Sequence, residues 1–160
     1  MSWEENEKKK EYLNGYREAK RREKRILEQI QRLRLDKMFP CLQNDDMPHG
    51  HNQSDLSDYA ANLYDYETDL KITMDSSDLI KREIKRAARK LQKNENLYII
   101  CKYIEFLSTY EIETIIGVKR RRLYDIEKSA IENIEIDEVI INECLRRIGE
   151  SNCYSSNGRL

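Results

Sequence analysis

The residues with the clearest chemical potential form a short basic cluster, made up of Lys119, Arg120, Arg121, Arg122, Tyr124, Asp125 and Lys128. An arginine on a helix can donate two hydrogen bonds to a guanine edge in the major groove of DNA, and Lys or Arg can pair with phosphates. We therefore predict base contacts for Arg120 and Arg121, and phosphate contacts for Arg122 and Lys128. The alternative is an ordinary helical corner with a basic surface, because such corners also occur in proteins that bind no DNA.

Two short helices joined by a tight turn are predicted to position this basic cluster. Ser108 and Thr109 are good capping residues for a helix over residues 110–116, and Gly117 is suited to a left-handed turn. A second helix is expected from residue 119 to about residue 133, and its inner side carries Leu123, Ile126, Ala130 and Ile131. This arrangement is a helix-turn-helix, whose second helix can enter a major groove.

Two positions depart from the usual helix-turn-helix pattern. Glu113 stands inside the first helix, where a small residue commonly allows the two helices to approach closely. We expect either a slightly opened crossing or a Glu113 side chain that reaches solvent. Lys119 stands where a capping Ser is frequent.

The composition of the whole chain favours helices. The 160 residues include 29 Lys and Arg against 30 Asp and Glu, 39% are hydrophobic, and only 5 are Gly and 2 are Pro. So few turn-forming residues leave little material for a many-stranded sheet, and so polar a chain cannot bury a wide core. We predict an all-α fold of elongated helices that share narrow seams, which excludes most enzyme folds.

A long antiparallel coiled-coil hairpin is predicted over residues 4–94. The heptad spacing of apolar residues indicates one arm over about residues 4–38 and a second over about residues 55–94. Residues 39–54 are assigned to the connecting loop because they contain both prolines. Thr73 and Ser77 weaken the middle of the second seam.

Charge is distributed unevenly along these arms. Antiparallel pairing would bring the basic end of the first arm beside the acidic start of the second, which is favourable. At the opposite end, residues 8–10 would lie near the basic residues 81–93. We interpret this end of the hairpin as a surface that faces phosphates, and call it the phosphate-facing end. The alternative is a set of solvated surface charges.

The other segments predict little further chemistry. Residues 135–150 are expected to form a short acidic helix, and residues 151–160 a disordered tail. The four cysteines show no paired spacing, and His49 and His51 match no standard zinc module, so we expect no disulfide, metal or cofactor. No nucleophile–His–acid triad or Gly-rich phosphate loop indicates an enzyme. With no apolar span and no signal-peptide layout, the chain is expected to be cytoplasmic, with no membrane partner.

Two motifs resemble known proteins. Residues 117–131, GVKRRRLYDIEKSAI, resemble the C-terminal promoter-reading helix-turn-helix of bacterial sigma factors, and the similarity covers about residues 95–134. Met47-Pro48-His49-Gly50 followed by Ser54-Asp55, between two long helices, is similar to small phage and prophage proteins of Gram-positive bacteria, the RinA/ArpU-type regulators of late transcription. Together the two similarities cover most of the chain.

The resemblance implies a phage or prophage transcription regulator in the cytoplasm of a bacterial host. It would bind promoter-region double-stranded DNA through Arg120, Arg121, Tyr124 and their neighbours, and would contact host RNA polymerase. A homodimer through the long helices is also compatible with the sequence. Two other functions stay open: a DNA-packaging recognition protein similar to a small terminase subunit, and a coiled-coil scaffold without sequence-specific DNA binding.

Overall fold

The computed structural model describes residues 3–38 and 53–156 of the chain. In these ranges the elements are α1 (Trp3–Met38), α2 (Gln53–Ala88), α3 (Lys93–Ile99), the π-helical segment η1 (Ile100–Ile104), α4 (Thr109–Ile116), α5 (Arg120–Asn133) and α6 (Glu138–Ser156). No strand occurs among these elements, which confirms the prediction of an all-α fold. The predicted loop motif at Met47 lies outside the described residues.

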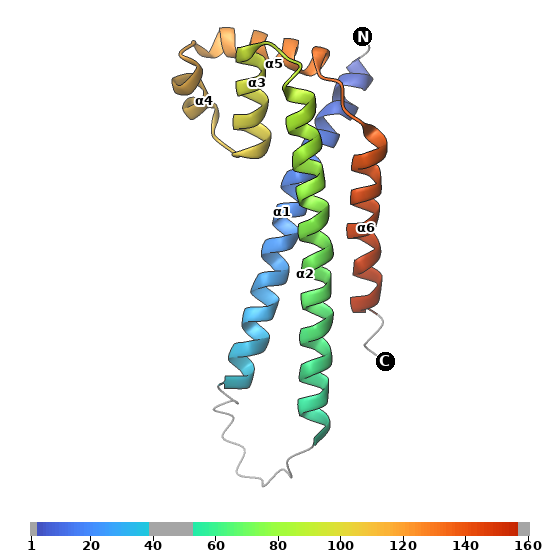
Figure 1. Ribbon diagram of the computed structural model, residues 1–160. Coiled ribbons are helices and arrows are strands. Elements are labelled where there is room, and N and C mark those ends of the chain that lie inside the picture. Colours follow the sequence, from blue (N-terminus) through green and yellow to red (C-terminus); the bar gives the residue numbers. More distant parts are fainter. Residues whose placement is uncertain (1–2, 39–52, 157–160) are drawn as a thin grey trace.

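The two long helices, α1 and α2, run side by side in opposite directions, and α6 packs along the half of this pair that is remote from the loop (Figure 1). Each long helix has 36 residues, about 54 Å at a rise of about 1.5 Å per residue. Their apolar stripes are narrow and bury the following side chains: Leu13, Tyr16, Ala19, Ile26 and Ile30 of α1, and Ile80, Ile84, Ala87 and Ala88 of α2. The arms therefore pair within one chain.

Polar side chains fill the middle of the seam between α1 and α2. Arg22 donates hydrogen bonds to both carboxylate oxygens of Asp69, at 3.0 and 2.9 Å, and both side chains are almost fully buried. Thr73 and Ser77, expected to weaken the seam, are fully buried about one and two helical turns after Asp69. A bidentate Arg–carboxylate contact has a fixed geometry, so it fixes the axial register of the two arms.

The second arm ends earlier than the sequence predicts. Helix α2 stops at Ala88 rather than near residue 94, and a turn over residues 89–92 leads into α3. The amides of Lys90 and Leu91 donate to the carbonyls of Ala87 and Ala88, a pattern that tightens the last helical turn. Leu91 still packs against the core, which explains why the heptad pattern continued past the true end of the helix.

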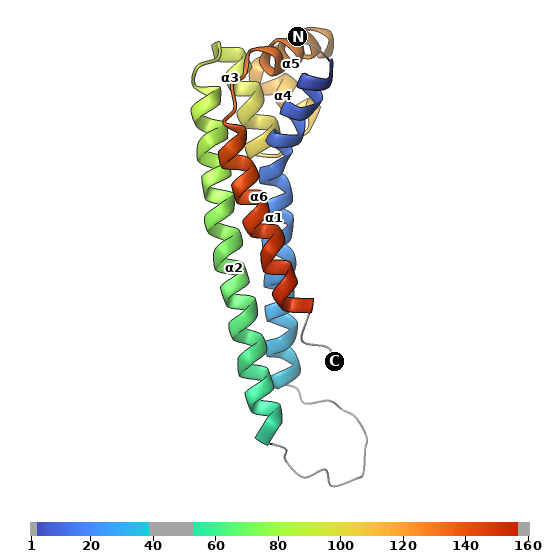
Figure 2. The ribbon, with the colours of Figure 1, turned by 90° about the vertical axis from the view of Figure 1, so that its right-hand side faces the viewer.

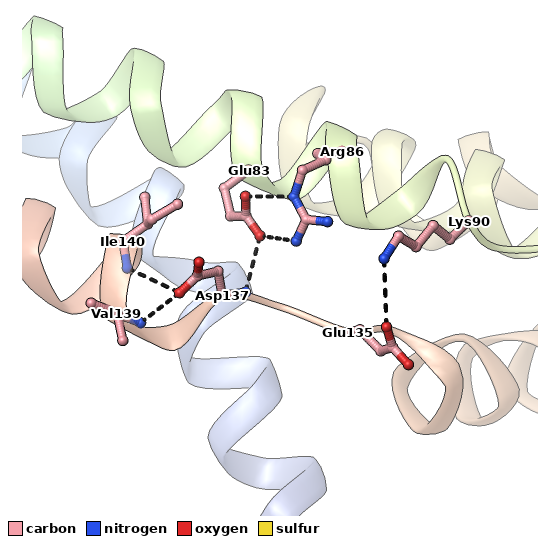
Figure 3. Close-up of polar contacts among 7 residues, drawn as sticks. All are labelled: Glu83, Arg86, Lys90, Glu135, Asp137, Val139 and Ile140. Carbon is pink, nitrogen blue, oxygen red and sulfur yellow. Dashed lines mark hydrogen bonds and ion pairs between the residues drawn. The ribbon is translucent and has the colours of Figure 1, made fainter.

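A network of polar contacts joins α2 to the start of α6 (Figure 3). The Glu83 carboxylate accepts hydrogen bonds from the Arg86 guanidinium and, at 2.9 Å, from the backbone amide of Asp137. These donors hold the pKa of Glu83 below its ordinary value. The Asp137 carboxylate in turn accepts from the amides of Val139 and Ile140, as an N-terminal capping residue does.

Helix α6 is longer than the expected acidic helix over residues 135–150. It begins at Glu138 and ends at Ser156, so residues 151–156, assigned from their composition to a disordered tail, are helical. Helix propagation adds one hydrogen bond per residue once a helix has formed, and this favours continuation into a polar segment. Residues 157–160 lie outside the described part of the chain.

Candidate nucleic-acid interface

The two helices on either side of Gly117 have well-formed ends. The Ser108 hydroxyl accepts from the Glu111 amide, and the Glu111 carboxylate accepts from the Ser108 amide at 2.7 Å, so α4 begins with a capping box. These bonds from Ser108 hold the pKa of Glu111 below its ordinary value. Helix α4 ends at Gly117, whose φ of 78° and ψ of 31° place it in the left-handed conformation predicted for the turn.

Helix α5 lies across the end of the α1–α2 pair, between the first turns of α1 and the turn that joins α2 to α3 (Figures 1 and 2). Its inner side buries the four predicted residues, Leu123, Ile126, Ala130 and Ile131. They join a core that also includes Ile99 of α3 and Ile112 of α4. The opposite side of α5 faces away from the rest of the protein.

The basic cluster lies on the part of α5 that the core leaves uncovered. All seven of its residues, Lys119, Arg120, Arg121, Arg122, Tyr124, Asp125 and Lys128, are exposed. The side chains of Lys119, Arg121, Arg122 and Lys128 form no hydrogen bond or ion pair with any residue that the structure describes. Tyr124 exposes 66% of its surface, unusually much for an aromatic residue. These groups need not give up an internal partner when an anion or a base binds.

Arg120 differs from its neighbours because it has an acidic partner. Its Nε lies 3.3 Å from Oε1 of Glu113, the residue that replaces the usual small side chain in α4. The expectation that Glu113 reaches solvent is met in part, since 20% of its side chain is exposed. The Arg120 side chain is 78% exposed, and exposed ion pairs are weak, so Arg120 stays accessible to a ligand.

Contacts that the sequence did not predict hold α5 in place. Lys9, near the start of α1, donates to the carbonyls of Ile131 and Glu132 at 3.2 and 3.1 Å, which are among the last carbonyls of α5. A cation at this helix end satisfies free carbonyls and interacts favourably with the helix dipole. The two partners are more than 120 residues apart, so no local sequence pattern signals the contact.

Two further contacts anchor α5 to α3 and η1. Ser129 donates to the buried carboxylate of Glu95. Glu127 accepts from Lys102 at 2.8 Å, and the same ammonium donates to the hydroxyl of Tyr98. Burial raises the pKa of Tyr98, so its phenol stays protonated. Helix α5 is thus tied to its surroundings at the middle and at the C-terminal end, and its first turn is held by the buried Leu123 and by the exposed Arg120–Glu113 pair.

A strained residue anchors the loop that precedes α4. Phe106 has a positive φ of 56°, which is uncommon for a residue with a large side chain. Its ring stacks on Tyr16 at 5.6 Å between centroids, and the Arg17 guanidinium lies 5.1 Å from the ring centre. These contacts with α1 offset the backbone strain and fix the α4–α5 unit against the hairpin.

The described residues offer no sign of a metal or redox centre. They contain no group of three or more His, Cys, Asp or Glu that could hold a metal ion. Cys101 and Cys144 are free and buried, and burial raises the pKa of both thiols. His49 and His51 lie outside the described residues. None of the helices in residues 3–38 and 53–156 has the length and apolarity needed to span a membrane.

Comparison with known proteins adds no relative. No protein-family model, no curated protein and no solved structure matches this chain.

Proposed function

We propose that the protein is a DNA-binding transcription regulator that reads double-stranded DNA with α5. The observation that carries the proposal is the cation-rich first turn of α5, which is exposed and makes few internal contacts. Arg121 and Arg122 are accessible there, and the positive end of the helix dipole adds to their attraction for phosphate. Arg121 is assigned to base reading and Arg122 and Lys128 to phosphates.

The polar residues beside these cations suit the same role. Tyr124 lies one turn after Arg120 and presents a hydroxyl donor and acceptor together with an aromatic face. Asp125 can accept a hydrogen bond from the amino group of cytosine. The left-handed Gly117 gives the connection between α4 and α5 a defined geometry, and a preformed reading helix loses little entropy on binding.

The biological setting is proposed from the sequence resemblance alone. On that basis the protein acts in the cytoplasm of a bacterial host as a phage- or prophage-encoded activator of late genes, with host RNA polymerase as its partner. A homodimer through the long helices belongs to the same proposal. A mass measurement in solution tests this part, because a ring of many subunits would instead favour a DNA-packaging protein similar to a small terminase subunit.

Footprinting on the duplex DNA that surrounds the protein's own coding region, at two salt concentrations, tests the DNA-binding proposal. The wild type is expected to protect a discrete site, and the variant Arg120→Ala/Arg121→Ala to lose it. The matched control is Lys24→Ala/Lys71→Ala, which removes two exposed cations from the long helices. Equal loss of protection in the control, or protection without any preferred site, would indicate charge-driven binding and support the scaffold alternative.

A further inference from the structure

The turn between α2 and α3 brings a second group of cations beside α5. Arg89 in this turn and Lys93 at the start of α3 are exposed and form no side-chain hydrogen bond or ion pair with the described residues. Both views place this turn next to α5 and at the same end of the molecule (Figures 1 and 2).

The side of α5 that faces this turn also carries a cation. Ser129 of α5 bonds to Glu95 of α3, so this side of α5 faces the start of α3. Arg122 precedes Ser129 by seven residues, two helical turns, and thus lies on nearly the same side of the helix. Arg122, Arg89 and Lys93 together define what we call the turn flank.

The opposite flank of α5 has a different electrostatic character. There the first turns of α1 pass close to α5, and a hollow of about 190 Å³ is lined by residues of both helices, among them Lys10 of α1 and Tyr124 and Lys128 of α5. Lys10 pairs with Glu7 at 3.1 Å, and Lys9 is bound to the end of α5. Glu4 and Glu5 add negative charge in the same turns. The predicted phosphate-facing end of the hairpin is therefore divided. In its α2–α3 part, Lys90 pairs with Glu135 at 3.6 Å, whereas Arg89 and Lys93 form no side-chain ion pair with the described residues.

We propose that the turn flank binds the phosphate strand that borders the DNA groove entered by α5. The inference rests on the proposed function. A helix with its side chains is about 10–12 Å wide and fills a major groove of about 12 Å, so a segment beside the helix meets the bordering sugar-phosphate strand. Arg89 and Lys93 supply the positive charge there. On the α1 flank, Glu4, Glu5 and Glu7 offset the three lysines at positions 8–10, and Lys128 is the cation that α5 itself contributes.

The salt dependence of binding tests this assignment, with the wild-type site as a duplex probe and potassium chloride as the salt. Each phosphate contact contributes about 0.9 to the slope of log K against log salt. Arg89→Gln/Lys93→Gln is expected to make the negative slope shallower by about 1.8. When salt is raised from 50 to 200 mM, the loss of affinity should then be about twelvefold greater for the wild type than for the variant. Base preference should not change. The matched control Lys8→Gln/Lys24→Gln should keep the wild-type slope.

The outcomes separate this inference from the proposed function. If the wild type binds a preferred sequence and Arg121→Ala relaxes that preference, but Arg89→Gln/Lys93→Gln keeps the full slope, the turn flank assignment is wrong and the reading role of α5 stands. If both double variants lower the slope equally, the effect is one of total charge and the assignment is also wrong. If the wild type binds no duplex DNA, both proposals fail. Circular dichroism of each variant establishes that its helices are intact.

Discussion

Replacing Gly117 with alanine should destabilise the protein even though the new methyl group has room. A Cβ at this position meets nothing within 4 Å, so no steric clash with neighbouring residues is involved. The cost is in the backbone, because the φ of 78° is left-handed and an L-residue with a Cβ pays about 1–2 kcal/mol there. We expect Gly117→Ala to lower the free energy of unfolding by this amount, and Gly117→Asn by less, since asparagine tolerates the conformation better.

Gly149 provides the matched control for this experiment. It lies inside α6, and a Cβ there also meets nothing within 4 Å. Its backbone is helical, so Gly149→Ala should raise stability by about 0.5–1 kcal/mol. Urea unfolding followed by circular dichroism measures both variants. If Gly117→Ala were neutral or stabilising while Gly149→Ala behaved as expected, the left-handed turn between α4 and α5 would be wrong.

Three other changes have expected outcomes that follow from single contacts. Asp69→Ala leaves Arg22 in the seam without its carboxylate partner and should lower the free energy of unfolding in urea by about 3–5 kcal/mol. The double variant Arg22→Met/Asp69→Leu should recover most of that loss. Equal losses in the two variants would show that the two residues are not coupled. Glu113→Gln removes the acid that contacts Arg120 and should tighten DNA binding about two- to fivefold at low salt. Weaker binding of this variant in a DNA titration would contradict the assignment of Arg120 to DNA contact. The pKa of Glu83 is lowered mainly by its hydrogen bond with Arg86. The ionised Glu83 side chain should therefore contribute its full stabilisation above the ordinary carboxyl pKa of 4.5, and this contribution should disappear as the pH falls through the lowered pKa. Glu83→Gln should therefore reduce stability at pH 7 and give a smaller decline in acid, and an unchanged acid profile would refute this.

The sequence predicted those features that depend on neighbours along the chain. The heptad positions of Tyr16, Ala19 and Ile84 indicated buried seams, and Ser108 and Gly117 indicated the two ends of α4. Each of these signals arises within one or two helical turns. The exposure of the basic cluster followed from the same periodicity, because the apolar side of α5 determines which side remains outside.

The features that were missed depend on how distant segments meet. The Arg22–Asp69 pair requires one axial register between two long helices, and many registers satisfy the same heptad pattern. The contact of Lys9 with the end of α5 requires the position of α5 on the hairpin, which no local pattern specifies. The predicted phosphate-facing end is divided for the same reason. Simple pairing of the arms would bring residues 8–10 close to residues 81–93, but α5 lies between the first turns of α1 and the turn after α2.

The proposed reading of DNA sequence by the first turn of α5 can be tested by selection of binding sites from a random duplex library. The wild type should enrich a short motif that contains guanine. Arg121→Ala should lose the preference at one or two adjacent positions, at about 1–3 kcal/mol per lost bidentate contact, and keep it elsewhere. If the wild type enriched no motif, or if Arg121→Ala enriched an identical motif, α5 would not read DNA sequence through Arg121.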